Sequence, residues 1–263
     1  MLELERANKL LYRLDRMKSD FIVLASHELY TPLTLVSGYS NLMDEHLKQD
    51  DEKITLGQTR EIAGLMSTSV LRMQGVVQEI MNVARIAAGR LELSIGPVKL
   101  GHLADSVYQA FEDILRLRNL SLLIEEFEVP LIFGDGAHIK TVIYNLVENA
   151  IKYTPDGGEI TVKGYLSGAG VELSVHDTGI GIPLDEQKQI FSQFYTLGNV
   201  DNHSSSKSAF EGGGMGLGLT IASGIVEAHN GRIWVESRGE DRDSLPGSTF
   251  FVWLPIGSAQ DAE

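Results

Sequence analysis

Apolar residues recur at helical spacing over the first part of the chain. From Leu4, the positions Leu11, Leu14 and Phe21 follow at steps of seven, three and seven. This heptad-like seam predicts a long helix and favours a parallel coiled-coil dimer over a helix packed only on its own chain. Pro32 has no amide hydrogen, so it should bend this helix before the helix ends near residue 46.

A second helical pattern runs from about residue 54 to residue 90. The polar segment 48–53 separates the two patterns, which predicts a turn and therefore a helical hairpin. Two such hairpins would form a dimeric four-helix bundle. The mostly apolar stripe of the second helix consists of Ile62, Leu65, Met66, Ser69, Met73, Val76, Val77, Ile80, Val83 and Ala84.

The pattern changes after Gly89, and residues 91–97 resemble a hinge or a short strand. We therefore place a domain boundary between residues 94 and 95, with a second domain over 95–257 and a tail over 258–263. Strands alternate with helices there, which predicts a two-layer α/β sandwich and an α plus α/β fold class for the whole chain. The predicted elements are helices at 101–118, 136–153 and 217–229, a hairpin of 159–165 with 171–176, and strands at 120–127, 232–236 and 248–254.

Composition narrows the classes of function. The 263 residues include no cysteine and no apolar run of transmembrane length, which makes a cytoplasmic location the default. Residues 95–263 carry −12 of the net charge of −14. Nucleic acid is excluded as an expected partner because a phosphate backbone needs clustered cations. An anionic small ligand would need a cation or a helix N-terminus.

One histidine stands out in the first helix. His27 lies two residues from both Ala25 and Leu29, about 200° around the helix, so its ring should point away from the buried stripe. A neutral imidazole is a good nucleophile near pH 7, and the neighbouring Glu28 could take the proton that the ring releases. The alternative is an ordinary surface histidine.

A polar stripe lies on the predicted helix 136–153. Asn145, Asn149 and Lys152 share one face, and Glu148 lies beside them. Amide oxygens can ligate Mg²⁺ and a lysine can contact phosphate, so the stripe suits a metal-bound polyphosphate. A solvated helix face is the alternative.

Asp177 ends a predicted strand and is followed by Thr178, Gly179, Ile180 and Gly181. Glycines let the backbone turn beside a ligand, and a carboxylate at the strand end could accept from an exocyclic amine such as that of adenine. Asp-Thr-Gly also occurs in aspartic proteases. That alternative requires an all-β fold, which the predicted helices oppose.

A glycine-rich run at 212–218 leads into the helix 217–229. Such a run offers N–H groups and the positive end of a helix dipole to phosphate. Before it, residues 195–211 are polar and rich in serine, which predicts a lid over the ligand.

Together these stretches resemble the catalytic core of sensor histidine kinases of two-component signalling, over about residues 10–256. The H box corresponds to His27–Pro32, the N box to Asn145–Tyr153 and the G1 box to Asp177–Gly181. The F box corresponds to Phe191–Phe194 and the G2 box to Gly212–Gly218.

The resemblance implies that His27 is the phosphoacceptor, Glu28 its base, and Thr31 the residue that orients water when the protein acts as a phosphatase. It also implies that Asn145 ligates Mg²⁺ and that Asp177 binds the adenine of ATP. The other residues that would contact the nucleotide are Asn149, Lys152, Tyr153, Gly179, Gly181, Ile182, Gly214, Gly216, Leu217 and Gly218.

Three positions depart from the family pattern. Tyr30 stands where the H box usually has arginine, Thr196 where a cation usually follows the F box, and Thr141 where glutamine often precedes the N box. The lack of a cation at Thr196 would weaken stabilisation of the γ-phosphate. Lys207 could supply the positive charge instead.

We therefore expect an ATP-dependent protein-histidine kinase that autophosphorylates and passes the phosphoryl group to the receiver domain of a response regulator. A homodimer is expected, and a membrane would be contacted only through an N-terminal sensor part that precedes this sequence. A degenerate nucleotide-binding scaffold is the first alternative. An ATPase of the gyrase and chaperone fold is the second, and the H box opposes it.

Overall fold

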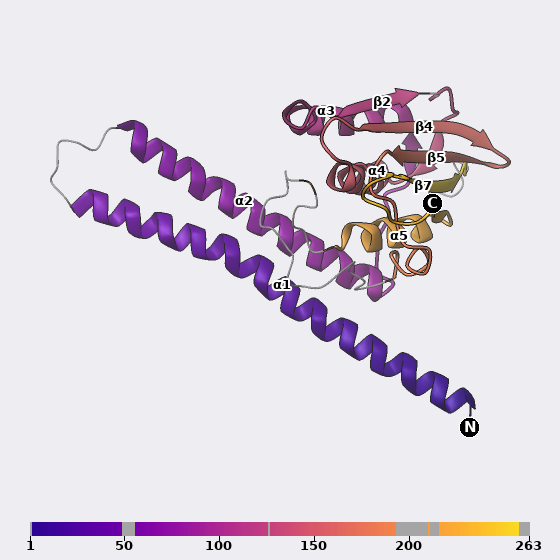
Figure 1. Ribbon diagram of the computed structural model, residues 1–263, viewed down its shortest axis with the longest axis horizontal. Helices are drawn as coiled ribbons and strands as arrows, with labels where there is room; N and C mark the ends of the chain where they lie inside the picture. The colour runs from indigo at the N-terminus through magenta and orange to yellow at the C-terminus, as the bar shows by residue number, and fades with distance from the viewer. Residues whose placement is uncertain (1, 49–55, 126, 193–209, 211–215, 258–263) are drawn as a thin grey trace. The chain divides into compact units, whose positions relative to one another are not determined.

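The computed structural model describes residues 2–48, 56–125, 127–192, 210 and 216–257, and the side chains of most residues before 22 lie outside this description. The chain divides into two compact units, Met1–Ala84 and Arg85–Glu263 (Figure 1). This division falls inside the second helix, whereas the sequence places the boundary at 94/95, so the predicted domain limits stay a prediction.

The first unit is the predicted helical hairpin. Helix α1 spans Leu2–Lys48 and continues through Pro32, and helix α2 spans Leu56–Ala87. Ala25, Val76 and Val83 are buried in this hairpin. The predicted turn at 48–53 lies largely outside the described residues. Several large apolar side chains of the hairpin are exposed in the single chain, among them Ile22, Val23, Leu65, Leu71 and Val77.

The second unit contains helices α3 (Leu100–Leu117), α4 (Gly136–Tyr153) and α5 (Gly218–Ala228). A five-stranded sheet has the order β2-β4-β5-β7-β6, in which the β2–β4 pair is parallel and the other pairs are antiparallel. Its strands are β2 (Ser121–Glu125), β4 (Glu159–Ser167), β5 (Gly170–Asp177), β6 (Arg232–Ser237) and β7 (Ser248–Pro255). A smaller sheet pairs β1 (Gly96–Val98) with β3 (Ile132–Gly134).

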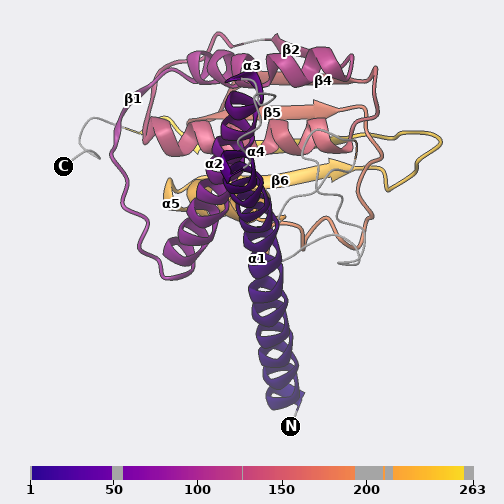
Figure 2. The ribbon, with the colours of Figure 1, turned by 90° about the vertical axis from the view of Figure 1, so that its left-hand side faces the viewer.

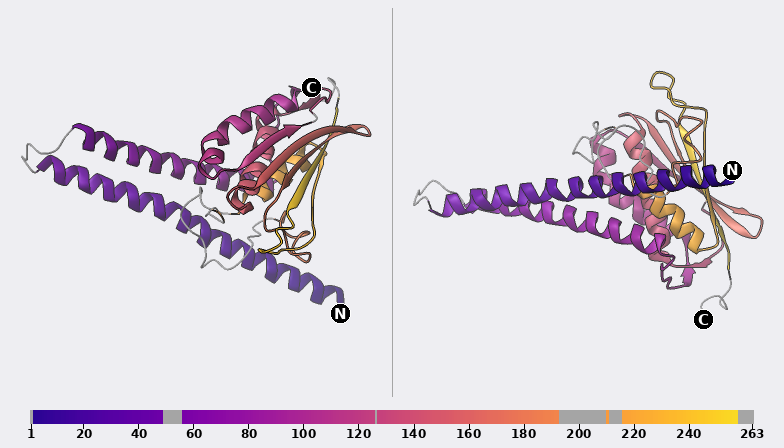
Figure 3. Two further views of the ribbon diagram at one scale, coloured as in Figure 1. Left: turned by 45° about the horizontal axis from the view of Figure 1, so that its top comes forward. Right: turned by 90° about the horizontal axis from the view of Figure 1, so that it is seen from below.

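The three helices of the second unit pack on one face of the large sheet, as Figures 2 and 3 show. Alternate side chains of each strand point into this layer, and Val175, Phe250 and Val252 are almost fully buried there. The fold is therefore a two-layer α/β sandwich, as predicted. Among the described residues, no helix combines the length and the apolar character that a membrane crossing needs.

The opposite face of the sheet carries aromatic side chains. Trp234 stacks on Phe251 with ring centroids 5.1 Å apart, and the Arg232 guanidinium lies 5.9 Å from the centre of the Trp253 ring. None of the described helices of the second unit covers this face. The aromatic rings therefore shield one another instead of packing under a second layer.

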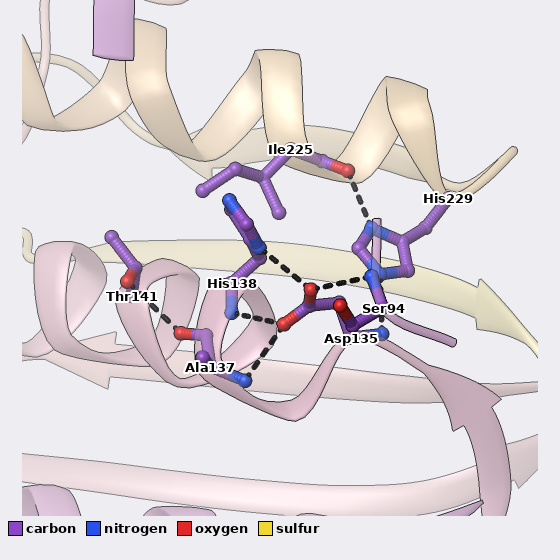
Figure 4. A network of polar contacts seen from close by, with 7 residues as sticks. All are labelled: Ser94, Asp135, Ala137, His138, Thr141, Ile225 and His229. Atoms are coloured by element: carbon purple, nitrogen blue, oxygen red, sulfur yellow. Dashed lines mark hydrogen bonds and ion pairs between the residues drawn. The ribbon is translucent and has the colours of Figure 1, made fainter. Parts of the chain in front are cut away.

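Asp135 joins Ser94, in the segment between α2 and β1, to the start of α4 (Figure 4). Its Oδ1 accepts from the backbone N–H groups of Ala137 and His138 at 3.0 Å, which caps the helix. Its Oδ2 accepts from Ser94 N at 2.8 Å and lies 3.0 Å from His138 Nδ1. The Asp135 N–H donates to Nε2 of the buried His229 at 2.9 Å.

These contacts make the stability of the second unit sensitive to acid through Asp135. Burial by itself raises the pKa of this carboxyl, but the N–H donors of His138 and Ser94 and the His138 ring outweigh it and lower the pKa from 3.8 to about 2. The ionised Asp135 carboxylate should therefore contribute about 2 kcal/mol to the free energy of unfolding of the second unit. This contribution should be fully present above pH 4 and lost as the pH falls towards 2. Asp135→Asn should remove it.

The measurement is urea unfolding of the wild type and Asp135→Asn between pH 7 and pH 2. The difference in the free energy of unfolding should shrink as the pH falls. Asp105→Asn, on the exposed side of α3, is the matched control and should show a small difference at every pH. A difference for Asp135→Asn that stays constant with pH would contradict the assignment.

Candidate functional site

Helix α4 brings its polar stripe against the start of α5. Asn145 Nδ2 donates to the carbonyl oxygen of Gly218 at 3.1 Å, so the Asn145 amide oxygen remains available as a ligand. At the end of the stripe, Lys152 Nζ lies 5.0 Å from the centre of the Tyr153 ring. Asn149, one turn after Asn145, is partly exposed. The predicted stripe therefore lies beside the predicted phosphate-binding helix.

Asp177 ends β5 and is almost fully buried. Its Oδ1 accepts from Gly179 N at 2.9 Å, and its Oδ2 accepts from Ser248 Oγ at 2.7 Å. Burial raises the pKa of the Asp177 carboxyl, while the hydrogen bonds from Ser248 and Gly179 oppose this effect. Both oxygens are thus held in place, with lone pairs left to accept from an amine of a ligand.

The glycine segment after Asp177 is tied to the end of α4. Ile180 N donates to Tyr153 O at 3.2 Å, and an added Cβ at Gly179 would lie 2.3 Å from that same carbonyl oxygen. Gly181 has a φ of +78°, which a residue with a side chain rarely adopts. Ile182 is buried, and its N–H donates to Ser237 Oγ at 3.0 Å. The Ile182 carbonyl oxygen accepts from Gln187 Nε2 at 3.1 Å, so both backbone groups of this residue are already hydrogen-bonded.

The close approach at Gly179 gives a test of this arrangement. Gly179→Ala should push the segment away from α4, lower the free energy of unfolding by about 1–3 kcal/mol and weaken ligand binding. Gly96→Ala is the matched control, because an added Cβ there meets nothing within 4 Å. Thermal unfolding and ligand titration of both variants measure the effect. Equal behaviour of the two variants would contradict the close approach.

The start of α5 carries the described part of the predicted glycine-rich loop. Gly218 begins the helix, and Gly216 has a φ of +67°. Leu217 is 1% exposed, so it can offer a ligand only its backbone. The first backbone N–H groups of α5 have no partner within the helix, which suits an anion. Gly214, Thr196, Lys207 and Phe194 lie outside the described residues, as does the predicted lid except for residue 210.

The predicted nucleophile belongs to the other unit, in α1. His27 is exposed, as the helical spacing predicts, and Thr31 Oγ1 donates to the His27 carbonyl oxygen at 3.1 Å. Tyr30 is 67% exposed. Glu28 is buried, and its Oε2 lies 3.2 Å from a guanidinium nitrogen of Arg72 on α2. Within the described residues, Glu28 contacts this arginine and makes no hydrogen bond to the His27 ring.

The structure therefore brings together one group of the predicted residues, formed by Asn145, Tyr153, Asp177, Gly179 and Gly218. His27, Glu28 and Thr31 form a second group in the hairpin.

The sequence does not predict two residues that contact these groups. Ser248 contacts Asp177 because the two residues are directly paired across β5 and β7. Arg72 contacts Glu28 across the hairpin. A strand register and a helix-to-helix contact join distant positions, and the local sequence pattern carries no signal for either.

The chemistry of the first group suits a purine nucleotide. The two buried carboxylate oxygens of Asp177 could accept from an exocyclic amine. The Asn145 amide oxygen could ligate a metal ion, and the helix N-terminus at Gly218 could bind a phosphate chain. The described residues contain no cluster of three His, Asp or Glu side chains that could hold a metal ion.

Two family models match the chain. The model described as His Kinase A (phospho-acceptor) domain matches residues 17–89, which contain His27. The model described as Histidine kinase-, DNA gyrase B-, and HSP90-like ATPase matches residues 134–258, which contain Asn145, Asp177 and Gly218.

Individual proteins show the same likeness. The chain is 32% identical over 241 residues to the circadian input-output histidine kinase CikA of Synechococcus elongatus, a match that covers 90% of this chain and 30% of that protein. A crystal form of the catalytic domain of histidine kinase ThkA is 30% identical with a TM-score of 0.51, and the match covers 63% of this chain and 99% of that domain. ThkA in complex with the response regulator protein TrrA is 26% identical with a TM-score of 0.57, over 97% of this chain and 66% of that chain.

Proposed function

The chain belongs to the histidine kinase family, and from this premise we propose that it transfers the γ-phosphoryl group of ATP to the imidazole of His27. The family resemblance of the sequence is thereby confirmed. The chain spans 30% of the length of the curated relative described above, so its activity, substrates and partners are proposals. The matched phospho-acceptor domain opposes the gyrase-type ATPase alternative.

One observation carries the proposal. Asn145 on α4 is hydrogen-bonded to Gly218 at the start of α5. The segment that Asp177 holds through Gly179 is hydrogen-bonded to Tyr153, at the end of the same helix α4. Asp177 would accept from the adenine amine, and the α5 N-terminus at Gly218 would bind phosphate. Tyr153 would lie against the base, and Lys152 and Asn149 near the phosphates. Asn145 Oδ1 would ligate Mg²⁺, which neutralises phosphate charge during transfer.

The exposed ring of His27 suits the acceptor role. A ring nitrogen would attack the γ-phosphorus, a P–N bond would form, and the bond to the β,γ-bridging oxygen would break to leave ADP. The second ring nitrogen would lose its proton, with Glu28 as the acceptor. Thr31, one turn further along α1, would orient water when the protein removes phosphate from its partner.

The receiver domain of a response regulator is the proposed partner and would take the phosphoryl group on an aspartate. The complex of ThkA with the response regulator TrrA supports this for a relative. A homodimer is also proposed, because the hairpin exposes large apolar side chains such as Ile22, Val23 and Leu71. ATP is the phosphoryl donor, so the reaction would take place on the cytoplasmic side.

The test is incubation of the whole chain with Mg²⁺ and ATP labelled at the γ-phosphate. Phosphohistidine is lost in acid and survives in base, so the expected label is acid-labile and base-stable. Label that survives acid would overturn the assignment to histidine. Tight binding of Mg·ATP without any label, in an intact dimer, would support a nucleotide-binding scaffold in place of a kinase.

A further inference from the structure

The acidic residue beside the proposed phosphoacceptor is held by the other helix of the hairpin. Glu28 is 5% exposed, and the one polar partner that the described residues provide for its carboxylate is Arg72, at 3.2 Å. Ala25, one turn before Glu28, and Val76, one turn after Arg72, are also buried. A carboxylate in such apolar surroundings needs a charged partner, and a guanidinium provides one.

The position of this carboxylate matters for the chemistry of His27. Neighbouring residues in a helix point in directions about 100° apart, and here His27 faces outward while Glu28 faces α2. Proton transfer requires the carboxylate and a ring nitrogen to come within hydrogen-bond distance, about 2.6–3.2 Å. The Glu28 carboxylate therefore has to leave Arg72 before it can take the proton.

We propose that Arg72 is a positioning residue, which holds the Glu28 carboxylate away from the His27 ring, and that autophosphorylation requires this ion pair to open. The inference rests on the proposed function, because it takes His27 as the acceptor. Arg72 thereby determines the fraction of molecules in which the Glu28 carboxylate is free to act as the base. It acts through Glu28 and touches neither the nucleotide nor the reacting atoms.

Removal of the guanidinium should therefore speed transfer. In Arg72→Gln the carboxylate loses its charged partner and turns towards water and the His27 ring. We expect the autophosphorylation rate at saturating ATP to rise by about 10- to 100-fold, the range that corresponds to one hydrogen bond to a charged group. The KM for ATP should not change, since the nucleotide residues lie in the other unit. Arg60→Gln, an exposed arginine on the same helix, is the matched control and should leave the rate unchanged.

A double-mutant cycle separates positioning from a general effect on the hairpin. Glu28→Ala should lower the rate, and the gain from Arg72→Gln should disappear in Arg72→Gln/Glu28→Ala. A rate in Arg72→Gln that is equal to or below the wild-type rate would overturn the inference. So would a gain that persists without Glu28.

A second readout needs no catalysis. The ¹⁵N chemical shifts of the His27 ring, recorded without ATP, should change in Arg72→Gln and return towards the wild-type values in Arg72→Gln/Glu28→Ala. Unchanged shifts in Arg72→Gln would refute the positioning role. If the shifts change as expected while no variant forms phosphohistidine, the proposed function fails and the ion pair keeps its assigned role.

Discussion

His27→Gln is expected to abolish the acid-labile label completely while the protein still binds Mg·ATP with the wild-type Kd. Glutamine keeps a polar side chain of similar reach but has no nucleophilic ring nitrogen. Because His27 is exposed, the substitution should change the free energy of unfolding by less than about 0.5 kcal/mol. The measurement combines labelling by γ-labelled ATP with nucleotide titration of the same preparation.

His102→Gln provides the matched control for this experiment. His102 is an exposed histidine in α3, so its replacement should leave both labelling and the Kd unchanged. Label that persists in His27→Gln would show that another residue accepts the phosphoryl group. A large rise in the Kd for Mg·ATP would instead mean that His27 contributes to nucleotide binding.

Asp177→Asn is expected to weaken ATP binding by about 10- to 100-fold with little loss of folded protein. A hydrogen bond to a charged group is worth about 1.5–3 kcal/mol, and each 1.4 kcal/mol corresponds to tenfold in the Kd. The amide oxygen can still accept from Gly179 N, and the Ser248 hydroxyl can accept from the new amide N–H, so the local structure should survive.

A comparison of ATP with GTP tests the contact between Asp177 and the adenine amine directly. The wild type should prefer ATP over GTP, because guanine carries a carbonyl oxygen where adenine carries the amine. Asp177→Asn should lose most of that preference, whereas Ser248→Ala, which removes one bond to Asp177 Oδ2, should reduce ATP binding less. An unchanged ratio of the two Kd values in Asp177→Asn would exclude Asp177 as the adenine contact.

Much of the fold follows from local pattern. Helix α4 has the predicted bounds, because its apolar positions Ile139, Val142, Ile143 and Leu146 recur at helical spacing and all become buried. The sequence does not predict strand β3, because three residues are too few to show the alternation of apolar and polar residues that is typical of a strand. It forms by pairing with β1, which is far away in the sequence.

Local sequence likewise predicts some residues of the candidate site and not others. Glycine-rich turns and a polar helix face are visible in the sequence, so Gly179 and Asn145 could be predicted. The contact between Asp177 and Ser248 depends on the register of β5 and β7, and the contact between Glu28 and Arg72 depends on how two helices face each other. Sequence spacing specifies neither, since both are set by packing of distant segments.

The aromatic face of the sheet has a spectroscopic consequence. Trp234 and Trp253 are the two tryptophans of the whole chain, and both lie on that face, while residues 1–84 contain none. Tryptophan fluorescence, excited selectively over tyrosine, will therefore follow the unfolding of the sheet and not report on the hairpin. Far-ultraviolet circular dichroism, which is dominated by helices, will follow both units. Comparison of the two signals during denaturation thus shows whether the hairpin and the nucleotide-binding domain unfold together or one after the other.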